Sequence, residues 1–256
     1  VNNVVKHTRI IRDPMDGDPG QGTGVFLQYG QQRSCLEIEC SQVGDSWWTG
    51  VTLAQSMATV SSSIIEGNWL GVEAQLQSTC WLFDDDIRNA ATADVGFLTG
   101  VGLLGDNSIL WVGDSRQSAP GRNRIRNNQL RQISVHNTST LWAGANGPQW
   151  LCGQPVCPMG GRNQFLSSNG AWRLWVDSTT NTELCHNWYG VAPDSIDGSY
   201  CHLGKLNADT LIHDERPGNY LLIYNPSACD TTDATPLPCA IASEGVLGGT
   251  SFSKST

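Results

Sequence analysis

Charged residues are scarce in this chain, and long apolar runs are missing. Asp, Glu, Lys and Arg make up 15% of the 256 residues, against about a quarter in a typical globular protein. No run of 18 apolar residues occurs, so we predict no membrane span. A basic-then-apolar leader is also missing, and because Val1 is no initiator we interpret the sequence as a mature or trimmed product. The formal charge of −9 repels phosphate backbones and predicts no nucleic-acid partner.

Glycine and tryptophan are abundant instead, with 28 and 10 copies. A Leu-Trp step occurs three times, ending at Trp111, Trp142 and Trp175, with spacings of 31 and 33 residues. Turn residues at 105–107 and 168–170 precede the first and third steps. Recurring apolar strands between Gly/Asn turns are typical of repeated β-units. We predict an all-β or β-rich, disulfide-bonded fold of repeated β-hairpin units, arranged as a β-prism or β-sandwich, with at most one short helix.

The single helix is expected near residues 53–66. Leu53, Met57, Val60 and Ile64 recur at helical spacing, and Gly67 is placed to end a helix. The β-branched and serine run within this stretch favours a strand equally. We divide the whole chain into four regions, namely an amino-terminal arm (1–20), an amino-terminal β region (21–100), the Leu-Trp repeat region (101–228) and a disulfide loop with a Gly/Ser/Thr-rich tail (229–256).

Nine cysteines indicate the compartment. Eight of them form local pairs, and no CxxC spacing with histidines suggests zinc. Disulfides in an oxidising, extracellular compartment are therefore predicted, with Cys80 left unpaired. The only sequon, Asn137-Thr138-Ser139, predicts glycosylation of Asn137. The predicted pairs are Cys35–Cys40, Cys152–Cys157, Cys185–Cys201 and Cys229–Cys239.

Two acidic clusters are candidate cation sites. Asp13, Asp16 and Asp18 lie in a Pro/Gly loop and suggest Ca²⁺, which binds carboxylate oxygens, but the EF-hand spacing is absent and a solvated turn is the favoured interpretation. The triple acid at 84–86 suits a cation or acid/base chemistry, although adjacent carboxylates on a strand alternate faces. We expect an exposed turn there and no cofactor.

Positive charge is concentrated between residues 116 and 131. Arg122, Arg124 and Arg126 alternate, so on a strand their guanidinium groups share one face. Such a face binds carboxylates or sulfates in a bidentate manner. A solvated strand face shows the same pattern.

The segment 165–177 resembles the strand-turn-strand opening of a bulb-type (monocot mannose-binding) lectin repeat. Segments 140–147 and 109–114 resemble the Leu-Trp-Ala-Ser step that closes such a repeat. The resemblance covers about residues 100–190 and implies a three-sheet β-prism that binds glycans. Of the family's Gln-x-Asp-x-Asn-x-Val-x-Tyr mannose strand only Asn181 is kept, which leaves the sugar open.

Carbohydrate binding is the leading functional hypothesis. Indole faces pack against sugar rings while Asn and Arg side chains bind hydroxyl groups. Several tryptophans lie beside turn residues, as loop-borne platforms do. We therefore predict a secreted, non-enzymatic protein that binds glycans or cell-surface polysaccharide through Trp142, Trp150, Asn181, Trp188, Arg122, Arg124 and Arg126.

Two alternatives remain open. The segment 110–115 resembles the Gly-Asp-Ser opening of SGNH-type esterases, which implies Ser115 as nucleophile with Asp209 and His213 as its partners. Pro120 interrupts the helix that such an enzyme needs after the serine. The other alternative is an extracellular structural, adhesin or filament subunit, in which the apolar arm and Cys80 support self-association.

Overall fold

The structure, a computed structural model, describes residues 2–11, 22–28, 34–45, 48–92, 99–113, 121–143, 149–151, 154–156, 163–166, 172–185, 187, 201–203, 212–215 and 222–223. These residues form strands and turns, and none of them is helical. Within these ranges no helix has the length and apolar character needed to cross a membrane.

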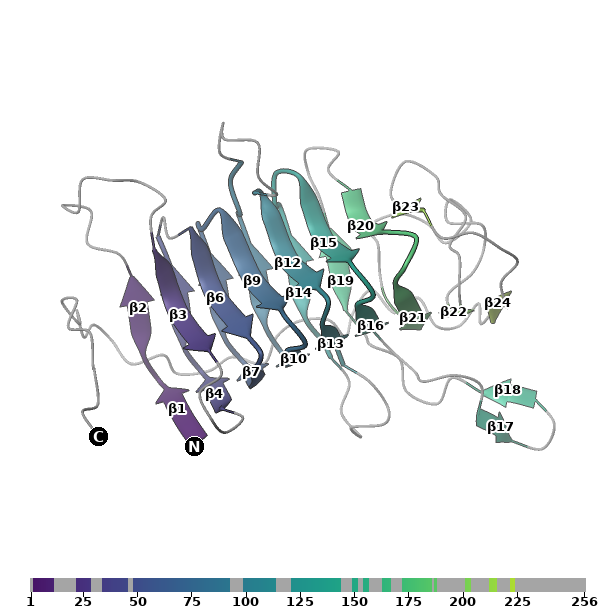
Figure 1. The fold of residues 1–256 in the computed structure, drawn as a ribbon, viewed down its shortest axis with the longest axis horizontal. Helices are drawn as coiled ribbons and strands as arrows, with labels where there is room; N and C mark the ends of the chain where they lie inside the picture. Colours follow the sequence, from purple (N-terminus) through teal and green to yellow (C-terminus); the bar gives the residue numbers. More distant parts are fainter. Residues whose placement is uncertain are drawn as a thin grey trace.

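Three sheets run side by side along the molecule (Figure 1). Sheet A contains β1 (Asn2–Lys6), β4 (Cys35–Glu39), β7 (Met57–Ser61), β10 (Thr79–Phe83), β13 (Ile109–Trp111), β16 (Thr140–Ala143), β21 (Asn181–Cys185), β22 (Cys201–Leu203) and β24 (Leu222–Ile223). Sheet B contains β2 (Arg9–Ile11), β5 (Gln42–Gly44), β8 (Ile64–Glu66), β11 (Asp86–Arg88), β14 (Arg124–Arg126) and β19 (Gln164–Leu166). Sheet C contains β3 (Thr23–Gln28), β6 (Thr49–Ala54), β9 (Leu70–Gln75), β12 (Val101–Asp106), β15 (Arg131–His136), β20 (Trp172–Val176) and β23 (Ile212–Asp214).

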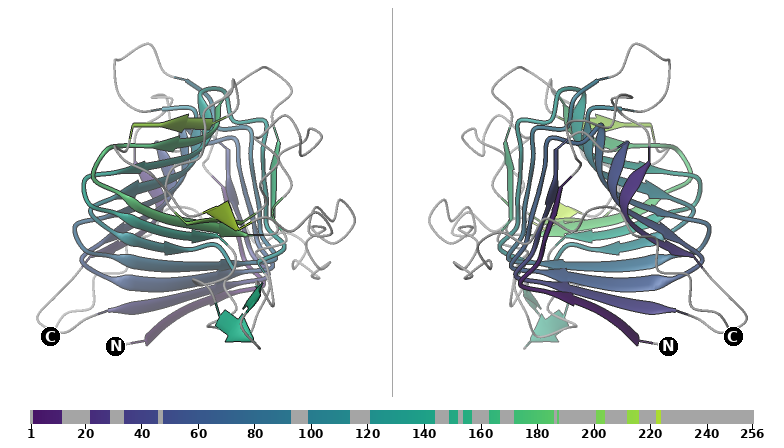
Figure 2. Two further views of the ribbon diagram at one scale, coloured as in Figure 1. Left: turned by 90° about the vertical axis from the view of Figure 1, so that its right-hand side faces the viewer. Right: turned by 90° about the vertical axis from the view of Figure 1, so that its left-hand side faces the viewer.

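The chain visits the sheets in the order A, B, C and then repeats, so each round is one coil of a parallel β-helix. Neighbouring strands are parallel from β1 to β21 in sheet A and throughout sheets B and C. Seen along the long axis, the coils superpose into a three-sided outline (Figure 2). Only β22 and β24 pair antiparallel within these sheets, and β17 (Gln149–Leu151) forms a separate antiparallel hairpin with β18 (Gln154–Val156). The predicted repeat is therefore confirmed, but its unit is a three-strand coil and not a hairpin.

The coil length is regular from β4 to β10 and greater on either side, since Asn2 and Cys35, which pair across β1 and β4, are 33 residues apart. Cys35, Met57 and Thr79 occupy one register position at intervals of 22 residues. The next equivalents, Ile109 and Thr140, follow at intervals of 30 and 31 residues. Insertions at the turns explain the longer coils, because the registers of the strands themselves are unchanged.

Apolar side chains fill the inside of the coils. The largest cluster of buried residues takes side chains from most strands between β3 and β20 and continues from coil to coil, and Val5 of β1 and Ile10 of β2 pack against it. Period-2 alternation explains the pattern, since in β4 Leu36 and Ile38 are buried while the residues beside them are half-buried. Sheet B supplies the row Val43, Ile65, Ile87, Ile125 and Phe165, all fully buried.

Glycines of sheet C make room for the isoleucines of sheet B. A Cβ on Gly71 would lie 2.7 Å from Cγ2 of Ile87 and 2.3 Å from the carbonyl oxygen of Gly102. Gly50 and Gly102 stand in the same way against Ile65 and Ile125. The glycine at this register position is therefore fixed by packing.

Polar side chains are stacked at the corner between sheets A and B. Backbone N–H groups donate to the side-chain oxygen one coil onward, from Ser41 to Ser63, Ser63 to Asp85, Asp85 to Asn123 and Asn123 to Asn163. Asn163 donates in turn to Asn187. These six residues are 0–1% exposed, and we call them the internal ladder. Stacked side chains thus satisfy backbone groups at a turn that no strand pairing reaches.

Several sequence predictions are wrong here. The expected helix at 53–66 is the end of β6, then β7 and β8. Short strands separated by turns reproduced the helical spacing of apolar residues. The triple acid at 84–86 is not an exposed turn, because all three residues are at most 9% exposed. The sequence of residues 1–12 is compatible with an edge strand or a free arm, and β1 and β2 are edge strands of sheets A and B. In sheet C, β9 pairs with β12 across residue 100.

The cysteine scheme also changes. Cys35 is a free thiol, whereas Cys40 is disulfide-bonded, so the Cys35–Cys40 bridge is wrong. The two residues lie at opposite ends of the extended β4, about 16 Å apart at roughly 3.3 Å per residue, and a disulfide needs Cα atoms about 4.4–6.8 Å apart. Cys185 and Cys201 face each other in the antiparallel pair β21–β22, where their bridge remains a prediction. The pairs Cys152–Cys157 and Cys229–Cys239 lie outside the described residues.

Candidate functional site: a tryptophan row on the outer face of sheet A

Three tryptophans share one register position on the outside of sheet A. Trp81 of β10 pairs with Trp111 of β13, which pairs with Trp142 of β16. Each is half-buried, while the residues before and after it, such as Leu110 and Leu141, face the core. Because neighbouring strands are about 4.8 Å apart, the rings stand one strand spacing from each other. We call these residues the tryptophan row.

Two rings of the row contact each other. The centroids of Trp111 and Trp142 are 3.8 Å apart with an interplanar angle of 49°. Trp81 holds the next register position on the same face. The three half-buried indoles thus lie in one line along the outside of the sheet, and such a line favours apolar contact with a flat ligand.

The same register position continues toward the amino-terminal end of the sheet with smaller and polar residues. Thr59 follows Trp81, and Glu37 and Val4 come next. At the other end, β21 places Glu183 opposite Trp142. The row is therefore an aromatic strip between hydrogen-bonding positions.

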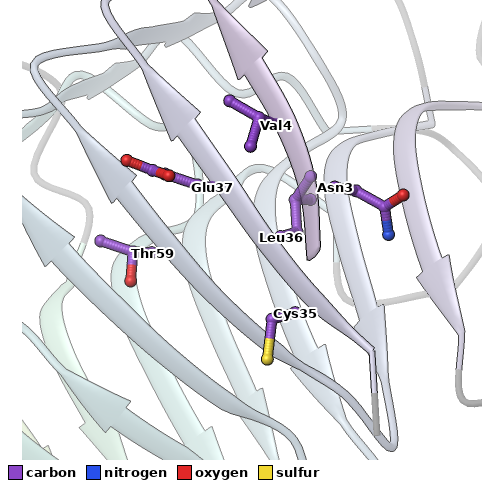
Figure 3. A pocket seen from close by; sticks show the side chains of 6 residues that line it. All are labelled: Asn3, Val4, Cys35, Leu36, Glu37 and Thr59. Atoms are coloured by element: carbon purple, nitrogen blue, oxygen red, sulfur yellow. The ribbon is translucent and has the colours of Figure 1, made fainter. Parts of the chain in front are cut away.

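A hollow of about 260 Å³ opens at the amino-terminal end of this row (Figure 3). Its volume is slightly below the usual 300–1,000 Å³ of small-molecule sites, so it suits a small ring. Amide, carboxylate, hydroxyl and thiol groups all reach its lining. The lining residues are Asn3, Val4, Cys35, Leu36, Glu37 and Thr59.

One amine and two carboxylates stand beside the hollow. Lys6 Nζ lies 3.0 Å from Oε1 of Glu37 and also contacts Glu39. The hydrogen bonds that Lys6 donates to Glu39 and, second, to Glu37 raise the pKa of Lys6, and the first of them lowers the pKa of Glu39. All three side chains are more than a third exposed. The pairs are therefore solvent-screened and leave a net negative charge.

The predicted ligand residues are divided among different places. Trp142 lies in the tryptophan row, and Asn181 occupies the register position next to Thr140 on the adjacent strand. Trp150 belongs to β17, in the hairpin that stands apart from the three sheets (Figure 1). Trp188 lies outside the described residues. Sequence reasoning missed Trp81, whose spacing to Trp111 equals one coil and was the available signal.

The arginines predicted to bind anions lie on or beside sheet B, away from the tryptophan row on sheet A. Arg124 and Arg126 point outward from β14 of sheet B, as their alternation predicted. Arg126 Nε and Nη2 donate to Asp86 at 2.9 and 2.8 Å, and Arg122 makes two contacts of 2.7 and 2.8 Å to Asp84. The carboxylates that Arg122 and Arg126 bind thus belong to the chain itself, and contact of these arginines with an anionic ligand stays a prediction. Arg124 donates to Gln164 at 3.2 Å.

Of the three residues predicted for an esterase, the structure describes only His213. Ser115 and Asp209 lie outside the described residues. His213 stacks on Trp175, with centroids 3.7 Å apart, and its Nε2 lies 3.0 Å from Glu215. Trp175 belongs to β20 of sheet C, whereas Trp111 and Trp142 belong to sheet A. The third Leu-Trp step is therefore not equivalent to the first two.

A different Ser-His-Asp set occurs on sheet C. Ser134 Oγ is 2.6 Å from Nε2 of His136, and Nδ1 of His136 is 3.9 Å from Oδ2 of Asp177. Burial, with the charge of Arg131 second, lowers the pKa of His136. Ser134 is 0% exposed and accepts a bond from Arg131. A substrate cannot reach a serine buried in this way, so the set is part of the packing of sheet C.

Two further predictions concern a calcium site and a glycosylation site. In the described ranges no group of three His, Cys, Asp or Glu side chains is placed to hold a metal ion. The calcium candidates Asp13, Asp16 and Asp18 fall outside those ranges. Asn137 is exposed at a turn, where its Nδ2 donates to Asp106 at 2.6 Å.

Comparisons with protein-family models, curated proteins and solved structures found no match to this chain.

Proposed function

We propose that this chain is a secreted carbohydrate-binding protein and that the outer face of sheet A is its binding surface. The observation that carries the proposal is the tryptophan row, which continues in register into a hollow lined by hydrogen-bonding groups. Sugars present both apolar C–H faces and hydroxyl groups, so they require this combination of aromatic and polar neighbours. The disulfide at Cys40 supports an oxidising, extracellular location.

The other aromatic group of the structure lies on sheet C. There the guanidinium of Arg131 lies 3.8 Å from the ring of Trp175, and His213 stacks on the same ring. Trp175 therefore belongs to a mixed cluster with basic side chains and has no register with the hollow. The tryptophan row ends beside Thr59, a small side chain that lines the hollow.

A glycan array followed by calorimetry tests the proposal. Trp111→Ala and Trp142→Ala should each weaken binding by about 1–3 kcal/mol, the scale of burying one large apolar side chain. Trp175→Ala is the matched control, because it removes an indole from the outside of sheet C. Equal losses in all three variants, or an array without any ligand, would contradict the proposal.

A further inference from the structure

The charge of the outer face of sheet A is one-sided. Among the described strands this face carries one cationic side chain, Lys6, against Glu37 and Glu39, and Glu183 occupies a further register position of the row. The described arginines of the arginine-rich segment lie elsewhere. Arg122 and Arg126 are held in ion pairs, Arg124 lies on sheet B and Arg131 on sheet C. A ligand on this face therefore meets net negative charge.

Glu37 places that charge inside the hollow. Glu37 lines the hollow together with Thr59, and its side chain is 47% exposed (Figure 3). Lys6 contacts one oxygen, Oε1, and divides its charge between Glu37 and Glu39. Among the described residues Oε2 of Glu37 has no partner, so it can accept a hydrogen bond from a ligand. An ammonium group is the strongest donor that a sugar ring offers to such an oxygen.

We infer that the glycan bound by the tryptophan row and the hollow contains free, protonated amino sugars. The inference rests on the proposed carbohydrate-binding function and specifies the class of its ligand. A uronic acid or sulfated sugar would bring a second negative charge to Glu37 and is disfavoured. A neutral sugar makes the same ring contacts as an amino sugar but lacks the attraction between charges.

Two hexasaccharides with the same β-1,4 backbone test this inference, one of glucosamine and one of glucose. They differ at a single substituent on each ring, amino against hydroxyl. At about pH 5.5, above the ordinary glutamate pKa of about 4.3, we expect the glucosamine oligomer to bind roughly two- to fivefold more tightly, the range of a solvent-exposed charge pair. Added salt should reduce this ratio, because the charges are screened.

Glu37→Gln is the decisive variant. It should bring the ratio close to one by weakening binding of the glucosamine oligomer more than that of the glucose oligomer, because the amide keeps a hydrogen-bonding oxygen but carries no charge. Lys6 keeps Glu39 as its partner. Glu215→Gln is the matched control, because Glu215 has a similarly exposed side chain, 44% against 47%, at the end of sheet C. Its ratio should equal that of the unaltered protein.

The free thiol of Cys35 reports where the oligomer binds. Cys35 lines the hollow and is half-buried, so a bound ring should slow its alkylation. Equal affinity for the two oligomers, or a ratio that survives Glu37→Gln, overturns the amino-sugar inference and leaves the proposed function standing. Failure of both oligomers to bind or to protect Cys35, with an array that is also negative, overturns both.

Discussion

The backbone N–H of Asp85 donates to Oδ1 of Asn123 across 2.9 Å, which joins a carboxylic acid to a stack of amides inside the protein. Oδ1 and Oδ2 of Asp85 accept from the backbone N–H groups of Ser63 and Phe83. Burial nevertheless dominates and raises the pKa of Asp85 well above its ordinary range. Asp85 is therefore a member of the internal ladder whose ionised form is disfavoured by burial.

Asp85→Asn should stabilise the protein at neutral pH by about 1–3 kcal/mol, the cost of a poorly satisfied buried polar group. An amide at this position would donate to the carbonyl oxygen of Val60, as Asn123 Nδ2 does to Leu82 at 2.9 Å. Chemical denaturation measures the difference. The reciprocal variant Asn123→Asp should lower the free energy of unfolding. If Asp85→Asn lowered it as well, the carboxylate would be the favoured group at position 85.

The same variant should change the pH dependence of stability. Because the folded-state pKa of Asp85 is raised, its contribution to stability is greatest below the unfolded value of about 3.9 and is lost as pH rises through the folded value. The stability advantage of Asp85→Asn should therefore grow with pH across that window. Melting temperatures measured at a series of pH values would refute this if the advantage stayed constant.

Gly71→Ala should destabilise the protein by about 1–3 kcal/mol, the usual cost of overpacking. The added methyl group would lie 2.3 Å from a backbone oxygen, which no side-chain rotation relieves. Gln28→Ala, at an exposed position of the same sheet, is the control and should be nearly neutral. Denaturant unfolding compares the two, and equal effects would mean that the coils separate easily.

Cys35 should react with a thiol reagent in the folded protein, and Cys80 should react only after unfolding. Cys80 is 0% exposed within the core, and burial raises its pKa, so little thiolate is present. Mass spectrometry of alkylated peptides, with and without denaturant, measures both. Burial is thus the alternative found for Cys80, and it disfavours a bond from Cys80 to another subunit in the folded chain. Rapid labelling of Cys80 would reverse this conclusion.

Arg126→Met should cost about 1–2 kcal/mol, because Asp86 is 11% exposed at its side chain and loses two of its charged hydrogen bonds. Arg88 remains 2.8 Å from Asp86 and limits the loss. Arg124→Met, one register position away and bonded to the neutral Gln164, should cost less. Unfolding free energies that rank the two variants in the opposite order would show that the ion pair contributes little.

Composition and spacing predicted the strand content and the equivalence of Trp111 and Trp142. They failed at Trp175, because a coil lengthened by an insertion places the next Leu-Trp step on another sheet. The intervals of 22 residues escaped detection because the residues that mark each coil, such as Ser56 and Ser78, are small and polar. Strand periodicity within five residues cannot be separated from helical periodicity when turns interrupt it, which explains the error at 53–66.

The binding residues were harder to predict for a related reason. Residues that face one another across parallel strands are at least a coil apart in sequence, as Thr59 and Glu37 are. Their proximity depends on the register, and the register depends on packing such as that of Gly71 against Ile87. The arginine pattern, by contrast, was visible because alternation is a local property of one strand.

A parallel β-helix is also a gauge of length. Each coil advances the outer face of sheet A by about 4.8 Å, so the distance from the hollow at Glu37 to Trp142 is set by the number of coils between them. Gain or loss of one 22-residue coil would lengthen or shorten this face by one step without altering the chemistry at either end. The extent of ligand that such a surface spans could therefore evolve in whole steps, independently of the ligand's identity.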